Sequence, residues 1–226
     1  MGTVDKRLAA DLRDRLKLGR AIETGTFRGI TARSLASLFD SVITIELSAP
    51  LHEHATTLLR DLPHVKTVHG HSAEALGAVA NADIPTLYFL DGHWSGGPTG
   101  GVEDQCPLLA EIAAIGAGHP DDCMIIDDAR LFTAAPPPPH NTAQWPAIVE
   151  VFDAIRAQRP DHLVTLLADQ VIAVPKRAQP AIDTYGARVR DTFGNRMRLL
   201  AAAVRGRIAY TRMGMRARAH RHSTQT

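Results

Sequence analysis

An acidic residue and a histidine follow a continuous apolar stretch in the middle of the chain. Asp91-Gly92-His93 comes directly after Thr86-Leu87-Tyr88-Phe89-Leu90. Histidine titrates near neutral pH, so His93 could take a proton from a hydroxyl group as that hydroxyl attacks a methyl group. The plainer alternative is that Asp91 caps a turn and His93 is a loop residue without a chemical role.

A pair of acids ends the next apolar stretch, where Cys123-Met124-Ile125-Ile126 is followed by Asp127 and Asp128. Two adjacent carboxylates repel each other unless another charge offsets them. A divalent cation such as Mg²⁺, held by Asp91, Asp127 and Asp128, would offset the repulsion and could bind two substrate oxygens. A salt bridge from Arg130 would serve equally well, and the sequence leaves both readings open.

A glycine turn near the N-terminus predicts a ligand site. The pattern is Glu23-x-Gly25-Thr26-x-x-Gly29, and Glu46 ends the next β-branched run. Glycines let backbone N–H groups approach a ligand closely, and a carboxylate at a strand end can accept hydrogen bonds from both hydroxyls of a ribose. The G-x-G-x-x-G pattern of dinucleotide-binding folds is missing, which argues against an NAD or nucleotide-sugar enzyme. The plain alternative is an ordinary tight turn.

These residues follow apolar runs that alternate with helical patterns. Helices are predicted at 4–17, 103–115 and 145–159, among others, and the runs 163–167 and 171–174 form an antiparallel hairpin. Such an order predicts a doubly wound α/β sheet with one antiparallel strand and helices on both faces. Ligands bind at the carboxyl ends of the strands in such sheets, which is where the residues above fall.

The E-x-G-x-x-x-G turn followed by Glu46 resembles the cofactor site of the class I S-adenosylmethionine-dependent methyltransferases. That resemblance covers roughly residues 15–178 and implies a seven-stranded Rossmann-like sheet. It implies that Glu23, Gly25, Thr26 and Gly29 hold the methionine part of S-adenosylmethionine and that Glu46 holds the ribose. Many members place an acid after the third strand to meet the adenine; here His71-Ser72 stands there, so Ser72 is the expected contact.

The pattern Asp91…Asp127-Asp128 resembles, within that class, the magnesium site of the macrocin O-methyltransferase-like group, which methylates sugar hydroxyls. The resemblance implies that these three acids hold the metal and that a histidine, here His93, serves as the base. The expected partner is therefore a glycan or another small-molecule acceptor. The alternative is a methyltransferase-like fold that transfers no methyl group and acts as a binding or scaffold protein through its basic tail.

Charge divides the chain into an acidic domain and a basic extension. Residues 186–226 hold ten arginines and one acid, a net charge of +9, whereas residues 1–185 carry −8. We expect a domain at 1–180, with 1–17 as a covering helix, and a partly disordered extension at 181–226. The extension would contact an anionic membrane surface or the acidic domain of a second copy in a homo-oligomer. The aromatic residues that RNA-binding proteins interleave with basic ones are missing.

The remaining composition favours a soluble cytoplasmic protein. The two cysteines, Cys106 and Cys123, show no metal-type spacing and no disulfide framework, which suits a reducing compartment. The N-terminus lacks the apolar region of a signal peptide, and no run is long enough to span a membrane.

Overall fold

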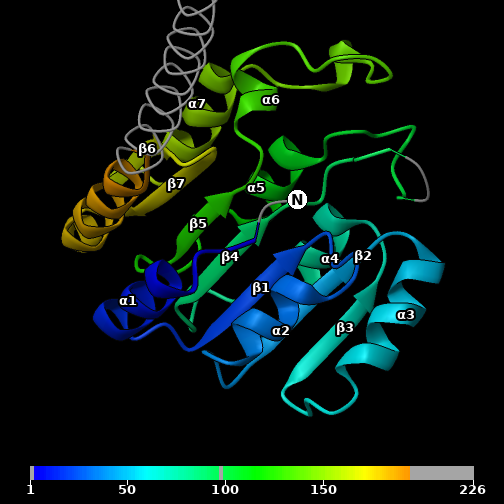
Figure 1. The fold of residues 1–226 in the computed structure, drawn as a ribbon, viewed down its shortest axis with the longest axis horizontal. Coiled ribbons are helices and arrows are strands. Elements are labelled where there is room, and N and C mark those ends of the chain that lie inside the picture. Colours follow the sequence, from blue (N-terminus) through cyan, green and yellow to red (C-terminus); the bar gives the residue numbers. More distant parts are fainter. Residues whose placement is uncertain (1–2, 97–98, 194–226) are drawn as a thin grey trace, which may run out of the picture. The chain divides into compact units, whose positions relative to one another are not determined.

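A central sheet of seven strands organises the protein in a computed structural model that describes residues 3–96 and 99–193 (Figure 1). The strand order is β3-β2-β1-β4-β5-β7-β6. The strands are β1 Arg20–Thr24, β2 Val42–Glu46, β3 Val65–His69, β4 Thr86–Leu90, β5 Cys123–Ile126, β6 His162–Leu167 and β7 Gln170–Pro175. Only β7 runs against its neighbours, pairing antiparallel with both β5 and β6. The predicted doubly wound sheet with one antiparallel strand is confirmed.

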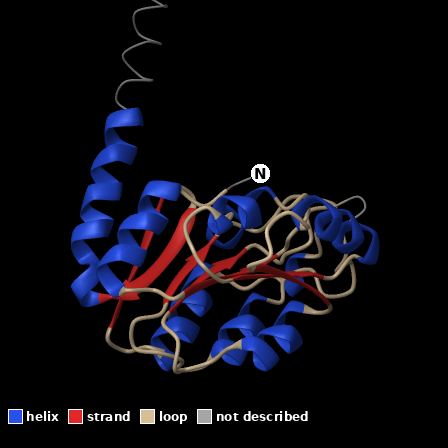
Figure 2. Ribbon diagram, turned by 90° about the horizontal axis from the view of Figure 1, so that it is seen from below, coloured by secondary structure: helices blue, strands red, loops and turns tan. Residues whose placement is uncertain are grey.

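Helices cover both faces of the sheet (Figure 2). They are α1 Lys6–Leu16, α2 Ile30–Ala36, α3 Ala49–Leu59, α4 Ser72–Val79, α5 Leu108–Ile115, α6 Arg130–Thr133 and α7 Ile148–Gln158, with short 3₁₀ turns at Thr142–Gln144 and Lys176–Ala178. On one face, α4, α5 and α7 pack in a row over a core that includes Leu76, Ile112 and Ile155. Burial of these apolar side chains supplies most of the drive for folding.

Two helices begin later than the sequence predicts, and proline explains both. The helix predicted at 103–115 begins at Leu108, after Pro107, and the helix predicted at 145–159 begins at Ile148, after Pro146. Proline is tolerated only in a first helical turn because it lacks an N–H group and restricts the residue before it. The residues in front of each proline form loops at the carboxyl end of the sheet. The amphipathic helix predicted at 4–17 is present as α1, with the Asp5 side chain accepting from the N–H groups of Arg7 and Leu8.

The register brings the strand ends together. Thr24 pairs with Leu90, Leu90 with Ile126, and Glu46 with His69. Because these strands are parallel, the residues that follow them emerge along one edge of the sheet. Glu46, Asp91 and Asp127 therefore come from distant parts of the sequence to a single edge.

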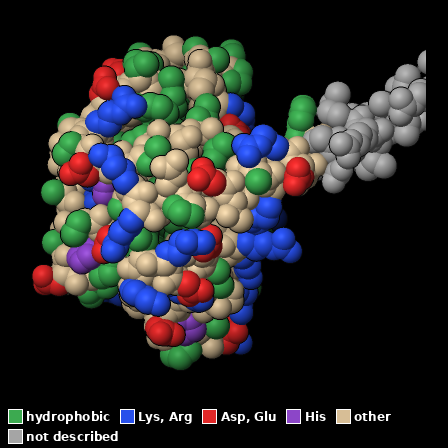
Figure 3. All heavy atoms as spheres, turned by 90° about the vertical axis from the view of Figure 1, so that its left-hand side faces the viewer, with side chains coloured by type: hydrophobic (Ala, Val, Ile, Leu, Met, Phe, Trp, Pro, Cys, Tyr) green, Lys and Arg blue, Asp and Glu red, His purple; other side chains and the backbone are tan. Residues whose placement is uncertain are grey.

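The chain divides by its internal contacts into two compact units, residues 1–183 and 184–226. In the second unit only residues 184–193 are described, and they are helical. Most of the predicted basic extension, residues 194–226, lies outside the described part, so its predicted partners stay predictions. Basic and acidic side chains are interspersed on the face shown in Figure 3. None of the described helices is long and apolar enough to cross a membrane.

Candidate functional site

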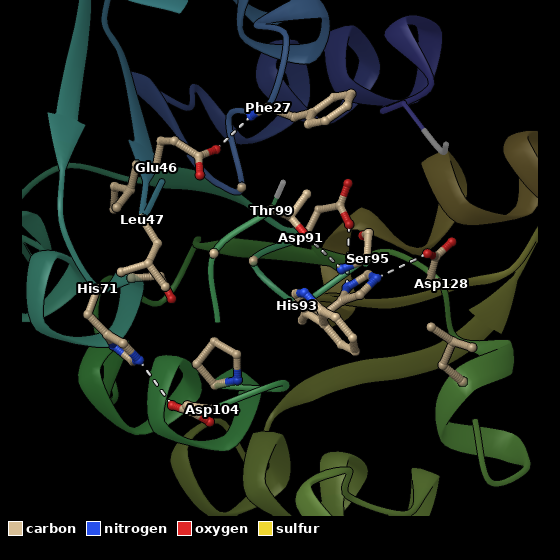
Figure 4. Close-up of a pocket in the computed structure, with 18 of the residues that line it drawn as sticks. Phe27, Glu46, Leu47, His71, Asp91, His93, Ser95, Thr99, Asp104 and Asp128 are labelled. Atoms are coloured by element: carbon tan, nitrogen blue, oxygen red, sulfur yellow. Dashed lines mark hydrogen bonds and ion pairs between the residues drawn. The ribbon is translucent and has the colours of Figure 1, made fainter. Parts of the chain in front are cut away.

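A cavity of about 410 Å³ opens at the carboxyl ends of the parallel strands (Figure 4). Six of the residues that the sequence singles out line it: Gly25, Glu46, Ser72, Asp91, His93 and Asp128. Four others lie behind its wall: Glu23, Thr26, Gly29 and Asp127. The volume suits a small organic ligand, and its location is the one expected for an open α/β sheet.

Gly25 makes the turn after β1 feasible. Its φ is +79°, and a Cβ atom at this position would collide with the backbone carbonyl of Asp91. Only glycine combines this backbone conformation with so close an approach. The N–H of Gly25 donates to the Ile45 carbonyl at 2.9 Å, which ties the turn to β2. The ends of β1, β2 and β4 are therefore packed tightly around the cavity floor.

Glu46 is held as an acceptor of hydrogen bonds. The N–H of Phe27 donates to its Oε2 at 2.8 Å (Figure 4). The N–H of Ser48 donates to its Oε1, also at 2.8 Å. These two bonds orient the carboxylate, and each oxygen keeps a further lone pair for a ligand hydroxyl. The residue is buried yet lines the cavity. Its ribose contact stays a prediction, and the carboxylate has the exposure to the cavity that such a contact needs.

Glu23 lies beneath the cavity. The hydroxyl of Thr44 donates to its Oε2 at 2.5 Å, and Thr44 is in turn 2.6 Å from the hydroxyl of Thr26. Burial raises the pKa of Glu23 from 4.5 to about 8, with repulsion from Asp91 and Glu46 adding to the effect and the Thr44 bond opposing it. Glu23 and Thr26 are thus linked through Thr44 beside the glycine turn.

His93 lies between two carboxylates. Its Nδ1 is 3.5 Å from Oδ1 of Asp91, and its Nε2 is 3.2 Å from Oδ2 of Asp128 (Figure 4). Only 6% of the His93 side chain is exposed. Each ring nitrogen thus faces a carboxylate, and the longer contact, at Nδ1, is the one that a substrate hydroxyl would have to replace for His93 to act as a base.

Burial and charge act in opposite directions on this group. Burial alone would lower the pKa of His93, but the hydrogen bond to Asp128 and the charge of Asp91 raise it above its usual value. The same bond lowers the pKa of Asp128. Burial raises the pKa of Asp91 to about 7, with His93 opposing the shift. The contact therefore favours a protonated His93 beside an ionised Asp128, while Asp91 is the acid whose pKa lies near neutral.

The two adjacent acids after β5 point to different partners. Asp127 accepts a hydrogen bond from the side-chain amide of Gln170 on β7 at 3.1 Å, whereas Asp128 meets His93 and Arg130. A backbone reversal separates them, since φ of Asp128 is +55°. The structure thus brings together Asp91, His93 and Asp128, whose ligand atoms lie within 4.8 Å of one another, in place of the expected Asp91, Asp127 and Asp128. Arg130 and His93 both lie within ion-pair distance of Asp128, so each can balance its negative charge in place of a metal.

The cavity narrows toward a wall of aromatic and imidazole rings. His140 lies 5.3 Å from Trp94 and 5.1 Å from Trp145, measured between ring centroids, and His93 lies 5.4 Å from Trp145. Trp94 and His140 line the cavity. Sequence reasoning passed over His140 because it stands alone after the proline run 136–139, with no motif around it.

Another acid reaches the cavity from an unexpected loop. Asp104 lies in the loop between β4 and α5, and its Oδ2 is 3.0 Å from Nε2 of His71 (Figure 4). Ser72 opens α4 beside them and is buried. An acceptor for an amino group therefore stands near the predicted adenine position, although the sequence has no acid directly after the third strand. Glu111 of α5, also overlooked, is buried beneath Gly92, and burial raises its pKa.

Comparisons with known proteins agree on the fold. No protein-family model and no curated protein matches the chain. An O-methyltransferase from Bacillus cereus solved with S-adenosylhomocysteine is 18% identical, with a TM-score of 0.54 over 76% of this chain and 80% of that one. A Podospora anserina methyltransferase, also with S-adenosylhomocysteine, is 17% identical, with a TM-score of 0.52 over 75% of each chain.

A Staphylococcus aureus protein, assigned only provisionally as a caffeoyl-CoA O-methyltransferase, is 16% identical, with a TM-score of 0.56 over 77% of this chain and 85% of that one. At such identities the likeness establishes the architecture and leaves the chemistry to the site. The chain has the Rossmann-like fold of the class I methyltransferases.

Proposed function

We propose that this protein is an S-adenosylmethionine-dependent methyltransferase that methylates a hydroxyl oxygen of a small molecule or sugar. One observation carries the proposal. The Glu46 carboxylate, oriented by two backbone N–H groups, shares a cavity with a histidine held between two carboxylates. The first feature suits a ribose diol, and the second suits removal of a proton from an attacking hydroxyl.

The residues at the cavity floor fit the cofactor. Glu46 would accept from the ribose hydroxyls, and Gly25 allows the ligand to approach the backbone. Ser72 and Asp104 would face the adenine amino group. When bound, S-adenosylmethionine supplies a methyl group activated by a sulfonium. Glu23, Thr26 and Gly29 support this site through the turn, because they lie outside the cavity wall.

His93 would act as the base. Nε2–H of the neutral ring would donate to Asp128, and Nδ1, whose contact with Asp91 is the longer at 3.5 Å, would take the proton from the acceptor hydroxyl; the carboxylates of Asp91 and Asp128 then stabilise the imidazolium that forms. The raised pKa of His93 makes the neutral ring a stronger proton acceptor. Positioning of the two reactants in a buried cavity supplies the remaining rate gain.

A metal-assisted form of the same reaction is the second candidate. Asp91, His93 and Asp128 could hold one divalent cation. A donor set of two carboxylates and one imidazole suits Mn²⁺ or Fe²⁺ as well as Mg²⁺, which prefers oxygen ligands alone. The likeness to the macrocin O-methyltransferase-like group rests on the sequence pattern Asp91…Asp127-Asp128, of which Asp91 and Asp128 belong to this donor set. The proposal also includes a glycan as the acceptor and a cytoplasmic location.

Calorimetric titration with S-adenosylhomocysteine tests the cofactor site. We expect wild-type protein to bind with a dissociation constant on the order of micromolar, and Glu46→Ala to weaken binding at least about tenfold through loss of charged hydrogen bonds. Glu74→Ala, an exposed acid in the first turn of α4, is the matched control and should bind as wild type does. If wild-type protein does not bind S-adenosylhomocysteine, the proposal is wrong.

The same titration in EDTA, in Mg²⁺ and in Mn²⁺ separates the two candidates. A base mechanism predicts equal affinity and equal activity in all three buffers. The metal-assisted mechanism predicts that Mn²⁺ or Mg²⁺ binds by itself, and that Asp128→Asn abolishes this binding while S-adenosylhomocysteine still binds.

A further inference from the structure

One buried glutamine joins the two loops that form the far wall of the cavity. Gln105 is only 4% exposed and lies in the loop between β4 and α5. Its hydrogen bonds reach the loop at 134–147, between α6 and α7. The helices that follow these loops, α5 and α7, pack against each other, and the hydrogen bonds of Gln105 join the loops themselves.

Gln105 contacts the second loop with both its side chain and its backbone. Its Oε1 accepts from the N–H of Asn141 at 2.8 Å and from Nε1 of Trp145 at 3.3 Å. Its own N–H donates to Oε1 of Gln144 at 2.9 Å, and Nε2 of Gln144 donates to the carbonyl of Glu103 at 3.1 Å. Four hydrogen bonds therefore cross between the loops, three of them through Gln105.

The same residue also fixes the first loop internally. The carbonyl of Gln105 accepts from the N–H of Trp94 at 2.8 Å. Gln105 thus binds both tryptophans, Trp94 at its backbone N–H and Trp145 at its indole N–H. His140 lies between them, edge-on to each.

Two ring nitrogens in this wall lack a hydrogen-bond partner among the described residues. They are Nε1 of Trp94 and Nδ1 of His140, and both are buried. Buried polar atoms are usually paired, and an exception indicates a role beyond packing. Trp94 and His140 also line the cavity alongside His93.

We propose that Gln105 is a positioning residue that locks the two loops into one rigid wall, so that Trp94 and His140 face His93 and bind the methyl acceptor. The binding of a methyl acceptor by Trp94 and His140 rests on the proposed function. The locking of the loops is independent of that function, because it follows from hydrogen bonds between described residues.

Hydrogen exchange followed by mass spectrometry tests the lock. In Gln105→Ala, peptides covering 99–107 and 134–147 should both exchange about tenfold faster, because loss of shared hydrogen bonds lowers the cost of local opening. Gln105→Glu keeps an accepting oxygen in place of Oε1 and should restore much of the protection. Gln158→Ala, at the end of α7, is the matched control and should change neither peptide.

The two tryptophans give a second measurement, since Trp94 and Trp145 are the only ones in the chain. We expect the emission of Gln105→Ala to shift to longer wavelength as both indoles meet water, and that of Gln105→Glu to stay near the wild-type value. If Gln105→Ala fails to fold, Gln144→Ala removes the other two crossing bonds, those with the Gln105 N–H and the Glu103 carbonyl, and should produce the same changes. Faster exchange in one loop alone, or in neither, overturns the proposal.

Binding of S-adenosylhomocysteine separates this proposal from the proposed function. Gln105→Ala should still bind it, less tightly than wild type, because the loosened loop carries Asp104 whereas Glu46 ends β2, outside both loops. If wild-type protein does not bind it, the proposed function fails while the exchange result still decides the lock. If binding is normal and the loops exchange independently, the lock alone fails.

Discussion

The chemistry of the site depends most on His93, whose two nitrogens both face carboxylates. We expect the pKa of His93 to lie above 6.5, because the Asp128 bond and the Asp91 charge outweigh burial. Asp128→Asn removes a charge and weakens the bond to the imidazolium, so it should lower this pKa. NMR titration of ¹³C-labelled histidine in EDTA measures it, with His93→Gln identifying the resonance.

Asp169→Asn is the control for this titration. Asp169 pairs with Arg130 and makes no described contact with His93, so its removal should leave the His93 titration nearly unchanged. An unchanged pKa in Asp128→Asn would show that the hydrogen bond does not govern the base. Because deprotonated His93 is the active form, methyl transfer should rise with pH through the same pKa.

Glu23 should cause the free energy of unfolding to fall as pH rises. Its folded pKa of about 8 exceeds its usual 4.5, so the stability it contributes is fully present below pH 4.5 and is lost as pH rises to 8. Each pKa unit corresponds to about 1.4 kcal/mol. Between pH 5 and 8, Glu23→Gln should therefore gain on the order of 3 kcal/mol relative to wild type in urea unfolding. Exposed Glu53→Gln is the control, and parallel curves for wild type and Glu23→Gln would contradict the prediction.

At the scale of elements, the turn between β1 and α2 should tolerate no side chain at residue 25. Gly25→Ala requires a positive φ and drives a Cβ into the Asp91 carbonyl, so it should destabilise folding by more than about 2 kcal/mol and weaken S-adenosylhomocysteine binding. Gly77→Ala is the matched control, since a Cβ there meets nothing and alanine should stabilise α4 by about 0.5–1 kcal/mol. Thermal unfolding of both variants gives the comparison.

The strands and their ends could be predicted from sequence, because apolar runs terminate in polar residues that the parallel register then gathers at one edge. Proline displaced two helix starts, which moved Gln105 and Trp145 out of predicted helices and into the loops that also carry Trp94 and His140. Their meeting depends on hydrogen bonds between residues about forty positions apart, such as Gln105 with Trp145, which leave no periodic pattern.

Local backbone conformation limited the prediction of the acidic cluster. Asp127 and Asp128 are equivalent as sequence, but a left-handed backbone at Asp128 and the side chain of Gln170 on β7 decide which one faces His93. Both depend on the completed sheet. The choice of Asp128 over Asp127 therefore required the structure.

At the scale of the whole molecule, one buried ion pair fastens the edge of the sheet opposite the cavity. Nη2 of Arg159 lies 3.0 Å from Oδ2 of Asp122, with side-chain exposures of 1% and 0%. Asp122 also accepts from the N–H groups of Thr86 at 2.8 Å and His119 at 2.9 Å. The pair therefore joins the start of β4, the loop before β5 and the segment between α7 and β6.

Removing one partner should leave a buried charge uncompensated. Arg159→Met should lower the free energy of unfolding by about 3–5 kcal/mol, whereas Asp161→Ala, which breaks the exposed pair with Lys176, should change it by less than about 1 kcal/mol. Chemical unfolding measures both. Because the pair lies at the edge opposite Glu46 and His93, folded Arg159→Met at low temperature should bind S-adenosylhomocysteine normally. Weakened binding in that variant would mean that the two edges of the sheet are energetically coupled.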